Sequence, residues 1–125
     1  MSETTSAATL APRVKELLED GDFDALASLL DPEVTWSAPD FPDDGCHNRG
    51  EVLAWWRAAH EAGVRAEVTQ SVAHGDAVLV SLKVRGRPEG SGDRFQVLSV
   101  GPRGVRSIVG FDTHADALAF ASGQS

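Results

Sequence analysis

Apolar residues recur every three or four positions near the start of the chain, which is the spacing of one face of a helix. Val14, Leu17 and Leu18 form such a face, and charged side chains occupy the opposite one. Gly21 suits the left-handed conformation that ends a helix, and Asp22 can accept hydrogen bonds from the free amides that open the next helix. The pattern therefore predicts two short helices that meet at this Gly-Asp pair.

Proline and glycine mark the next boundaries along the chain. The second helix begins at Phe23 and is expected to end before Pro32, because the residue ahead of a proline avoids helical angles. A short strand at 34–36 then leads into a turn-rich loop at 38–49. A third helix is predicted over 50–62, where apolar residues again share one face and a glycine follows.

From residue 64 to residue 111 the pattern changes to period two, as in strands with one buried face. Gly75 marks a tight turn between the first two strands, and two more strands are expected at 95–100 and 105–111. One face of the first strand is expected to be buried, and its members are Val64, Ala66, Val68, Gln70, Val72 and His74. A last short helix follows the strands.

The order of the elements predicts the fold class. Consecutive hairpins imply an antiparallel sheet, and helices that are separate from the strands imply the α+β class. The expected architecture is a cone-shaped, strongly curved antiparallel sheet wrapped around about three N-terminal and central helices. Its interior would be apolar and open to a small ligand.

The length of 125 residues suits a single domain that buries its own core. Residues 1–11 are rich in Ser, Thr and Ala and lack the basic start and apolar run of a signal peptide. They are expected to form a disordered tail. The domain is predicted to span 12–121, with 122–125 as a C-terminal tail.

The charge balance excludes some classes of partner. Eleven basic and nineteen acidic residues give a net charge of −8, which repels nucleic acids and anionic lipid surfaces. No apolar run approaches the roughly 18 residues of a membrane-spanning helix. The single cysteine, Cys46, cannot form an internal disulfide. A soluble, cytoplasmic protein without nucleic-acid or membrane partners is expected.

The order and spacing of these elements carry a family resemblance. The matching segments are 17–26, 30–36, 49–52 and the paired strands around Gly104 that end at Phe111. In these segments the chain resembles the nuclear-transport-factor-2-like superfamily, in particular its SnoaL-like polyketide cyclase and ketosteroid isomerase branch. The resemblance implies a cone whose mouth is lined by the first strand, the third helix and the last two strands, and it implies a homodimer.

The chain departs from the ketosteroid isomerase pattern at the positions that carry its chemistry. The resemblance would demand a tyrosine on the first helix and two carboxylates on strands, and by approximate counting these positions hold Val14, Ala38 and Gln96. The sequence has no tyrosine, which also argues against sites like those of scytalone dehydratase and limonene epoxide hydrolase. Any chemistry must therefore come from other residues.

Three polar residues are the candidate catalytic groups, namely His47, Asp112 and Gln96. His47, near the expected cone mouth, could act as general base or acid near neutral pH, with a solvated loop histidine as the alternative. Asp112 follows the last strand, where related cyclases carry an aspartate. Its alternative role is to cap the final helix, a role that Thr113 could also fill. Gln96 interrupts an apolar strand face and could hold a developing oxyanion.

Ligand binding is assigned to one further glutamine and four aromatic residues, namely Gln70, Trp36, Trp56, Phe95 and Phe111. The aromatic side chains could line a pocket for a flat ligand, or they could fill the core. A buried amide at Gln70 must find a partner, unless its face is a dimer interface or partly wet. Arg94 is expected at a solvated strand end.

No metal or cofactor is expected, because the four histidines share no ligand-like spacing and no glycine-rich phosphate loop joins a strand to a helix. The favoured function is an apolar pocket for a small hydrophobic, carbonyl-bearing molecule. The sequence leaves two versions of this function open. One is a cofactor-independent cyclase or isomerase that uses general acid and base catalysis, and the other is a non-catalytic ligand-binding or dimerisation module of the same fold.

Overall fold

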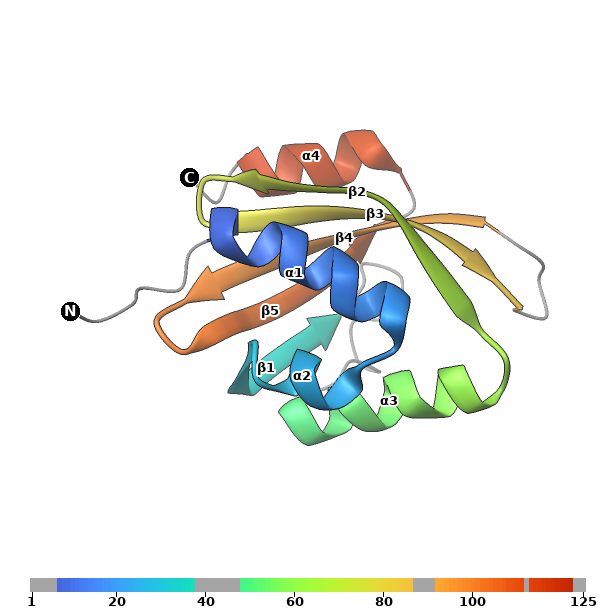
Figure 1. The fold of residues 1–125 in the computed structure, drawn as a ribbon. Helices are drawn as coiled ribbons and strands as arrows, with labels where there is room; N and C mark the ends of the chain where they lie inside the picture. Colours follow the sequence, from blue (N-terminus) through green and yellow to red (C-terminus); the bar gives the residue numbers. More distant parts are fainter. Residues whose placement is uncertain (1–6, 38–47, 87–91, 112, 123–125) are drawn as a thin grey trace.

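The computed structural model describes residues 7–37, 48–86, 92–111 and 113–122. Its helices are α1 (Ala7–Asp20), α2 (Phe23–Ala27), α3 (Arg49–Glu61) and α4 (His114–Ser122). Its strands are β1 (Leu30–Ser37), β2 (Arg65–His74), β3 (Ala77–Arg85), β4 (Gly92–Gly101) and β5 (Gly104–Phe111). Figure 1 shows α1, α2 and α3 on one side of a strongly twisted sheet and α4 on the other. The α+β class predicted from the sequence is confirmed.

The five strands of the sheet are ordered β1-β5-β4-β3-β2. β2 to β5 form consecutive antiparallel hairpins, as the alternating pattern predicts. β1 pairs parallel to β5, so the sheet is mixed where the sequence suggested a purely antiparallel one. The long connection between β1 and β5 allows this pairing, since a parallel neighbour needs a crossover rather than a tight turn.

The two faces of the sheet are covered differently. The inner face, which carries α1, holds the larger apolar core, made of Ala7, Leu10, Ala11, Val14, Leu30, Val34, Val52, Val68, Val78, Val80, Leu82, Val84, Leu98, Val105 and Ile108. The outer face packs against α4 through a smaller cluster of Ala77, Leu79, Val97, Ala117 and Ala121. Alternate residues of β3 therefore contribute to different cores.

A register shift in β2 changes which of its residues face inward. Val68 lies opposite Leu82, and after the shift Ser71 lies opposite Val80. Because Leu82 and Val80 both belong to the inner core, Ser71 continues the inner face that Val68 began. The predicted buried face was wrong beyond Val68, and the residues that lie on the outer face instead are Gln70, Val72 and His74.

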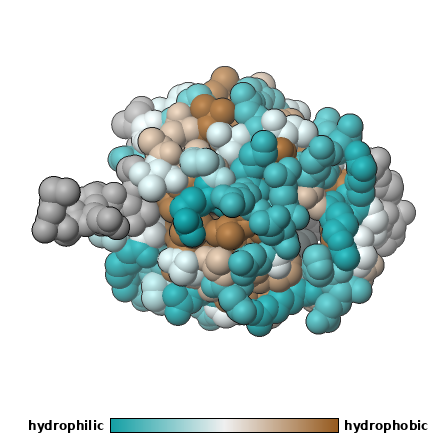
Figure 2. Space-filling view, viewed as in Figure 1, coloured by the Kyte–Doolittle hydropathy of each residue, from teal (hydrophilic) through white to brown (hydrophobic). Residues whose placement is uncertain are grey.

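Helix α1 begins earlier than the sequence pattern placed it. Ala7, Leu10 and Ala11 are buried, although they fall in the segment predicted as a disordered tail. Small side chains let the helix lie close to β2, where Ser71 Oγ donates a hydrogen bond to the Ala11 carbonyl at 2.6 Å. Alanine adds little to a hydrophobic pattern, so the buried face formed by Ala7, Leu10 and Ala11 can be recognised only from its packing. Figure 2 shows mainly hydrophilic side chains on this side of the molecule, with apolar surface between them.

The junction between the first two helices has the predicted form. Gly21 has a φ of 68°, and Asp22 Oδ1 accepts a hydrogen bond from the first turn of α2 at 3.2 Å. α2 ends at Ala27, earlier than predicted, and Pro32 lies inside β1. A proline is tolerated there because β1 is an edge strand with an irregular register against β5.

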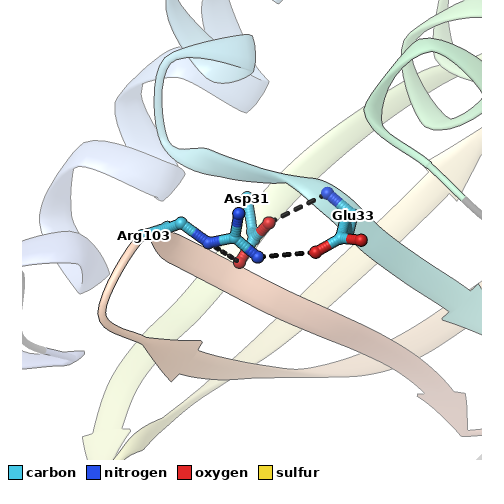
Figure 3. Close-up of polar contacts among 3 residues, drawn as sticks. All are labelled: Asp31, Glu33 and Arg103. Carbon is cyan, nitrogen blue, oxygen red and sulfur yellow. Dashed lines mark hydrogen bonds and ion pairs between the residues drawn. The ribbon is translucent and has the colours of Figure 1, made fainter.

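A set of polar contacts ties the turn between β4 and β5 to β1 (Figure 3). Arg103 Nη2 donates to Glu33 Oε2 at 2.7 Å, and Arg103 Nε lies 3.3 Å from Asp31 Oδ2. The Asp31 side chain is 9% exposed and also accepts a hydrogen bond from the Glu33 N–H at 2.9 Å. The hydrogen bond to Glu33 and the charge of Asp31 raise the pKa of Arg103 above its ordinary value.

Beside these charges, Gly104 of β5 lies directly against the backbone of Leu29, which precedes β1. Gly104 has a φ of 112°, and the next residue, Val105, donates its N–H to the Leu29 carbonyl at 2.8 Å. A Cβ added to Gly104 would overlap that same carbonyl oxygen. Glycine is therefore required both by the backbone conformation and by the available space.

The variant Gly104→Ala should lower the free energy of unfolding by about 3 kcal/mol, because it adds a steric overlap to a strained backbone angle. Urea denaturation measures the change. Gly92→Ala is the matched control, since a Cβ there meets nothing within 4 Å, and it should change stability by less than about 1 kcal/mol. Equal losses in the two variants would contradict the close approach of β5 to Leu29.

Candidate functional site

Gln96 and Arg94, both from β4, are polar side chains on the apolar inner face. Gln96 lies opposite Val80 on β3 and opposite Gly110 on β5. Arg94, two residues earlier, lies opposite Leu82. Val80 and Leu82 belong to the inner core, so both polar side chains point to that face, and each residue is half-buried.

The residues opposite Gln96 on β3 and β5 offer it no polar side chain. Its neighbour Val80 is fully buried, and Gly110 places no side chain opposite the amide. An amide carries two donor hydrogens and one acceptor oxygen, which are costly to remove from water unless they are hydrogen-bonded. A carbonyl or oxyanion of a ligand on the inner face would satisfy the donors.

An aromatic cluster lies between α2, β1 and α3 at the side of the inner face. The ring centroid of Trp36 lies 4.8 Å from that of Trp55 and 5.7 Å from that of Trp56. Trp56 also stacks on Phe23 at 6.4 Å. Trp36 and Trp56 both pack against the inner core. The structure thus brings together the two tryptophans that the sequence assigned to ligand binding.

Arg94 is a residue of the inner face that sequence reasoning did not assign to a site, whereas Trp55 was among the aromatic residues considered for a pocket lining. Trp55 is 57% exposed although it meets Trp36 edge-on. Arg94 was expected at a solvated strand end and is half-buried on the inner face instead. The sequence held a signal for Arg94, because residues two apart in a strand share a face and Gln96 was already expected to face inward.

The other predicted ligand residues lie on the outer face. Phe95 and Phe111 pair across β4 and β5 and pack beneath α4, where the ring centroids of Phe111 and Phe120 are 5.4 Å apart. Gln70 is exposed on the outer face of β2. The sheet therefore separates these three residues from Gln96. This corrects the grouping of Phe95 with Gln96, since adjacent strand residues point to opposite faces.

His47 and Asp112 lie outside the described residues, so Gln96 is the catalytic candidate that the structure places. At the start of α4, Thr113 Oγ1 accepts a hydrogen bond from the Asp116 N–H at 3.2 Å. Thr113 therefore fills the capping role that the sequence assigned to either Asp112 or Thr113.

The described residues show neither a cluster of metal ligands nor a membrane-spanning helix. Within residues 7–37, 48–86, 92–111 and 113–122, no three His, Cys, Asp or Glu side chains gather as metal ligands. None of the helices in these ranges is both long and apolar enough to cross a membrane. Among the described residues, the inner face carries the amide of Gln96 and the guanidinium of Arg94, and the rings of Trp36 and Trp56 pack against its apolar core.

Sequence comparison links the chain to one family. Residues 13–108 match the family model described as the SnoaL-like domain. No curated protein matches the chain.

Solved structures with the same fold include a candidate ketosteroid isomerase from Kribbella flavida, with a TM-score of 0.73 and 19% identity over 91% of this chain and 82% of that one. A candidate polyketide cyclase from Sinorhizobium meliloti has a TM-score of 0.68 and 22% identity, over 86% of this chain and 100% of that one. SalBIII is an epoxide hydrolase/cyclase-like enzyme with a role in pyran ring formation in the polyether salinomycin. It has a TM-score of 0.67 and 19% identity, over 88% of this chain and 92% of that one. These likenesses show the fold, and the match to the family model shows that the chain belongs to the SnoaL-like domain family.

Proposed function

We propose that the inner face of the sheet binds a small hydrophobic molecule that carries a carbonyl group. The observation that carries the proposal is the half-buried amide of Gln96 on the inner face, opposite the buried Val80. Small-molecule sites combine an apolar lining with a few convergent polar groups. Trp36 and Trp56 would pack against the flat surfaces of the ligand, and Gln96 would donate a hydrogen bond to its carbonyl oxygen.

The bound molecule would react without a cofactor, by general acid and base catalysis. Removal of a proton next to the carbonyl places negative charge on its oxygen, which Gln96 would stabilise. His47 or Asp112 would accept the proton and return it at another atom, which completes an isomerisation. The roles of similar folds support this version, because SalBIII acts in pyran ring formation and two other structures are a candidate cyclase and a candidate isomerase.

The alternative function is a non-catalytic ligand-binding or dimerisation module. The chain has Val14 and Gln96 where an isomerase of the resembled branch would carry a tyrosine and a carboxylate. Val14 is 2% exposed and forms part of the core, so its position supplies packing rather than a polar group. Binding without turnover would then be the whole function of the inner face.

A homodimer is the proposed assembly. The outer face of β2 supports it, because Val72 is half-buried there while α4 packs mainly on β3, β4 and β5. A second copy of the chain that covers the outer face of β2 would remove apolar surface from water. Light scattering on the purified protein should give twice the mass of one chain, and a monomeric mass would contradict the proposal.

Prodan, a fluorescent naphthalene ketone, tests the binding site directly. Gln96→Leu removes the proposed donor at nearly constant volume, so affinity should fall roughly fivefold, the loss of one hydrogen bond. The emission of the bound dye should also shift to shorter wavelength. Gln70→Leu makes the same change on the outer face and should give the wild-type spectrum. A wild-type protein that does not bind the dye would refute the site, and a spectrum unaffected by Gln96→Leu would refute the role of Gln96.

Exchange of the α-protons of 2-tetralone in D₂O, followed by NMR, separates the catalytic version from the alternative. A catalytic site should accelerate the exchange over buffer. His47→Gln or Asp112→Asn should then reduce the rate about 10²-fold or more, and Gln96→Leu should reduce it by a similar factor. Binding of Prodan without accelerated exchange would favour the non-catalytic module.

A further inference from the structure

Trp55 places much of an aromatic ring in water. Among the described residues it is the one large hydrophobic side chain that is exposed, at 57%. It lies on α3 one helical turn after Val52, which is fully buried in the inner core. The ring is nevertheless packed on one side, because its centroid lies 4.8 Å from that of Trp36 on β1. The protein therefore presents a supported indole ring at its surface.

The rings around Trp55 meet at steep angles. Trp36 and Trp55 make an edge-to-face contact with 71° between their planes, and Trp36 makes an angle of 57° with Trp56. In an edge-to-face pair the two planes form a corner, so part of each ring face is left uncovered by the other ring. A small group that lies on Trp55 beside Trp36 would therefore meet π faces from two directions.

Indole faces favour a particular kind of ligand. They carry negative charge density, and tryptophan attracts cations to its face more strongly than tyrosine or phenylalanine does. An ammonium ion with its own hydrogens must give up strong hydration to approach a ring. A quaternary ammonium group carries carbon substituents instead, so it gives up less hydration and also covers apolar ring surface. Two rings at a steep angle suit this rounded group, whereas a flat ligand needs parallel faces.

The charges of the protein also favour a cation at this surface. The net charge of −8 raises the local concentration of cations and repels anions. The arginine closest to Trp55 along the chain is Arg57, and its guanidinium is paired with the Asp24 carboxylate of α2. The positive charge on this side of α3 is therefore offset by a carboxylate, and it does not oppose a bound cation.

We propose that Trp55 and Trp36 form a binding site for a small solute with a quaternary ammonium group, such as choline. The inference goes beyond the proposed function, because this ligand needs neither a carbonyl group nor the Gln96 amide. Trp55 supplies the ring face that is open to water, and Trp36 supplies the second ring of the corner.

Choline and 3,3-dimethyl-1-butanol test the proposal, because the two molecules have nearly the same shape and only choline is charged. Protein labelled with ¹⁵N-tryptophan should give one indole N–H signal in NMR spectra for each of Trp36, Trp55 and Trp56. Choline should shift the Trp55 signal saturably and should bind roughly fivefold more tightly than the alcohol. Equal affinities would overturn the inference, since the surface would then be merely apolar. The absence of a saturable shift would overturn it as well.

Trp55→Leu removes the ring face but keeps an apolar side chain and the net charge of the protein. The preference for choline over the alcohol, measured on the Trp36 signal, should disappear, and Trp55→Phe should keep part of it. Phe120→Leu is the matched control, because it removes an aromatic ring from α4 on the outer face of the sheet. It should leave the choline affinity unchanged. A preference for choline that survives Trp55→Leu would contradict the site.

Two further measurements use the wild-type protein, so they do not depend on the folding of a variant. Tetramethylammonium chloride should shift an indole signal, whereas ammonium chloride at the same concentration should not, because its ion has the same charge and no methyl groups. Equal shifts would overturn the inference, since they would reflect attraction to the net charge alone. Phosphatidylcholine vesicles should not sediment the protein. Cosedimentation would overturn the assignment to a small solute, because the quaternary ammonium group would then belong to a lipid.

Discussion

The parallel pairing of β1 with β5 is the contact on which the rest of the structure depends. The other strand pairs are local hairpins, whereas this pair joins the helical N-terminal part to the edge of the sheet. It is held by the backbone hydrogen bond from Val105, by the close approach at Gly104 and by Arg103 between two carboxylates of β1. The pairing fixes Trp36 opposite β5, and thereby sets the aromatic cluster beside the face that carries Gln96.

The two faces of the sheet have different physical roles. α4 covers the outer face with alanine and aromatic side chains, and Phe95 is part of that packing. The inner face is apolar through most of β3 but carries a half-buried amide and guanidinium from β4, at Gln96 and Arg94. The cost of keeping the Gln96 amide among aliphatic side chains is what supports the ligand proposed for this face.

Much of the fold could be predicted because its signals are local. The positions of the helix junction at Gly21 and of the hairpins follow from residues close together in the chain, and they are confirmed. The start of α3 is likewise local, since Asn48 accepts from the Glu51 N–H at 3.0 Å and caps the helix. For the candidate site, Trp36 and Trp56 were named from the sequence as residues that could line a pocket or fill the core, and the structure places their ring centroids 5.7 Å apart.

The sequence by itself determined the order of the elements, the α+β class and the family, because periodicity and turn chemistry are properties of short segments. Tertiary structure alone decided the parallel partner of β1, the early start of α1 and the register shift that turned Gln70 outward. It also decided that Phe95 packs under α4 while Gln96 faces the inner core. Each of these outcomes depends on contacts between distant residues, and in a strand a shift of one position moves a side chain to the opposite face.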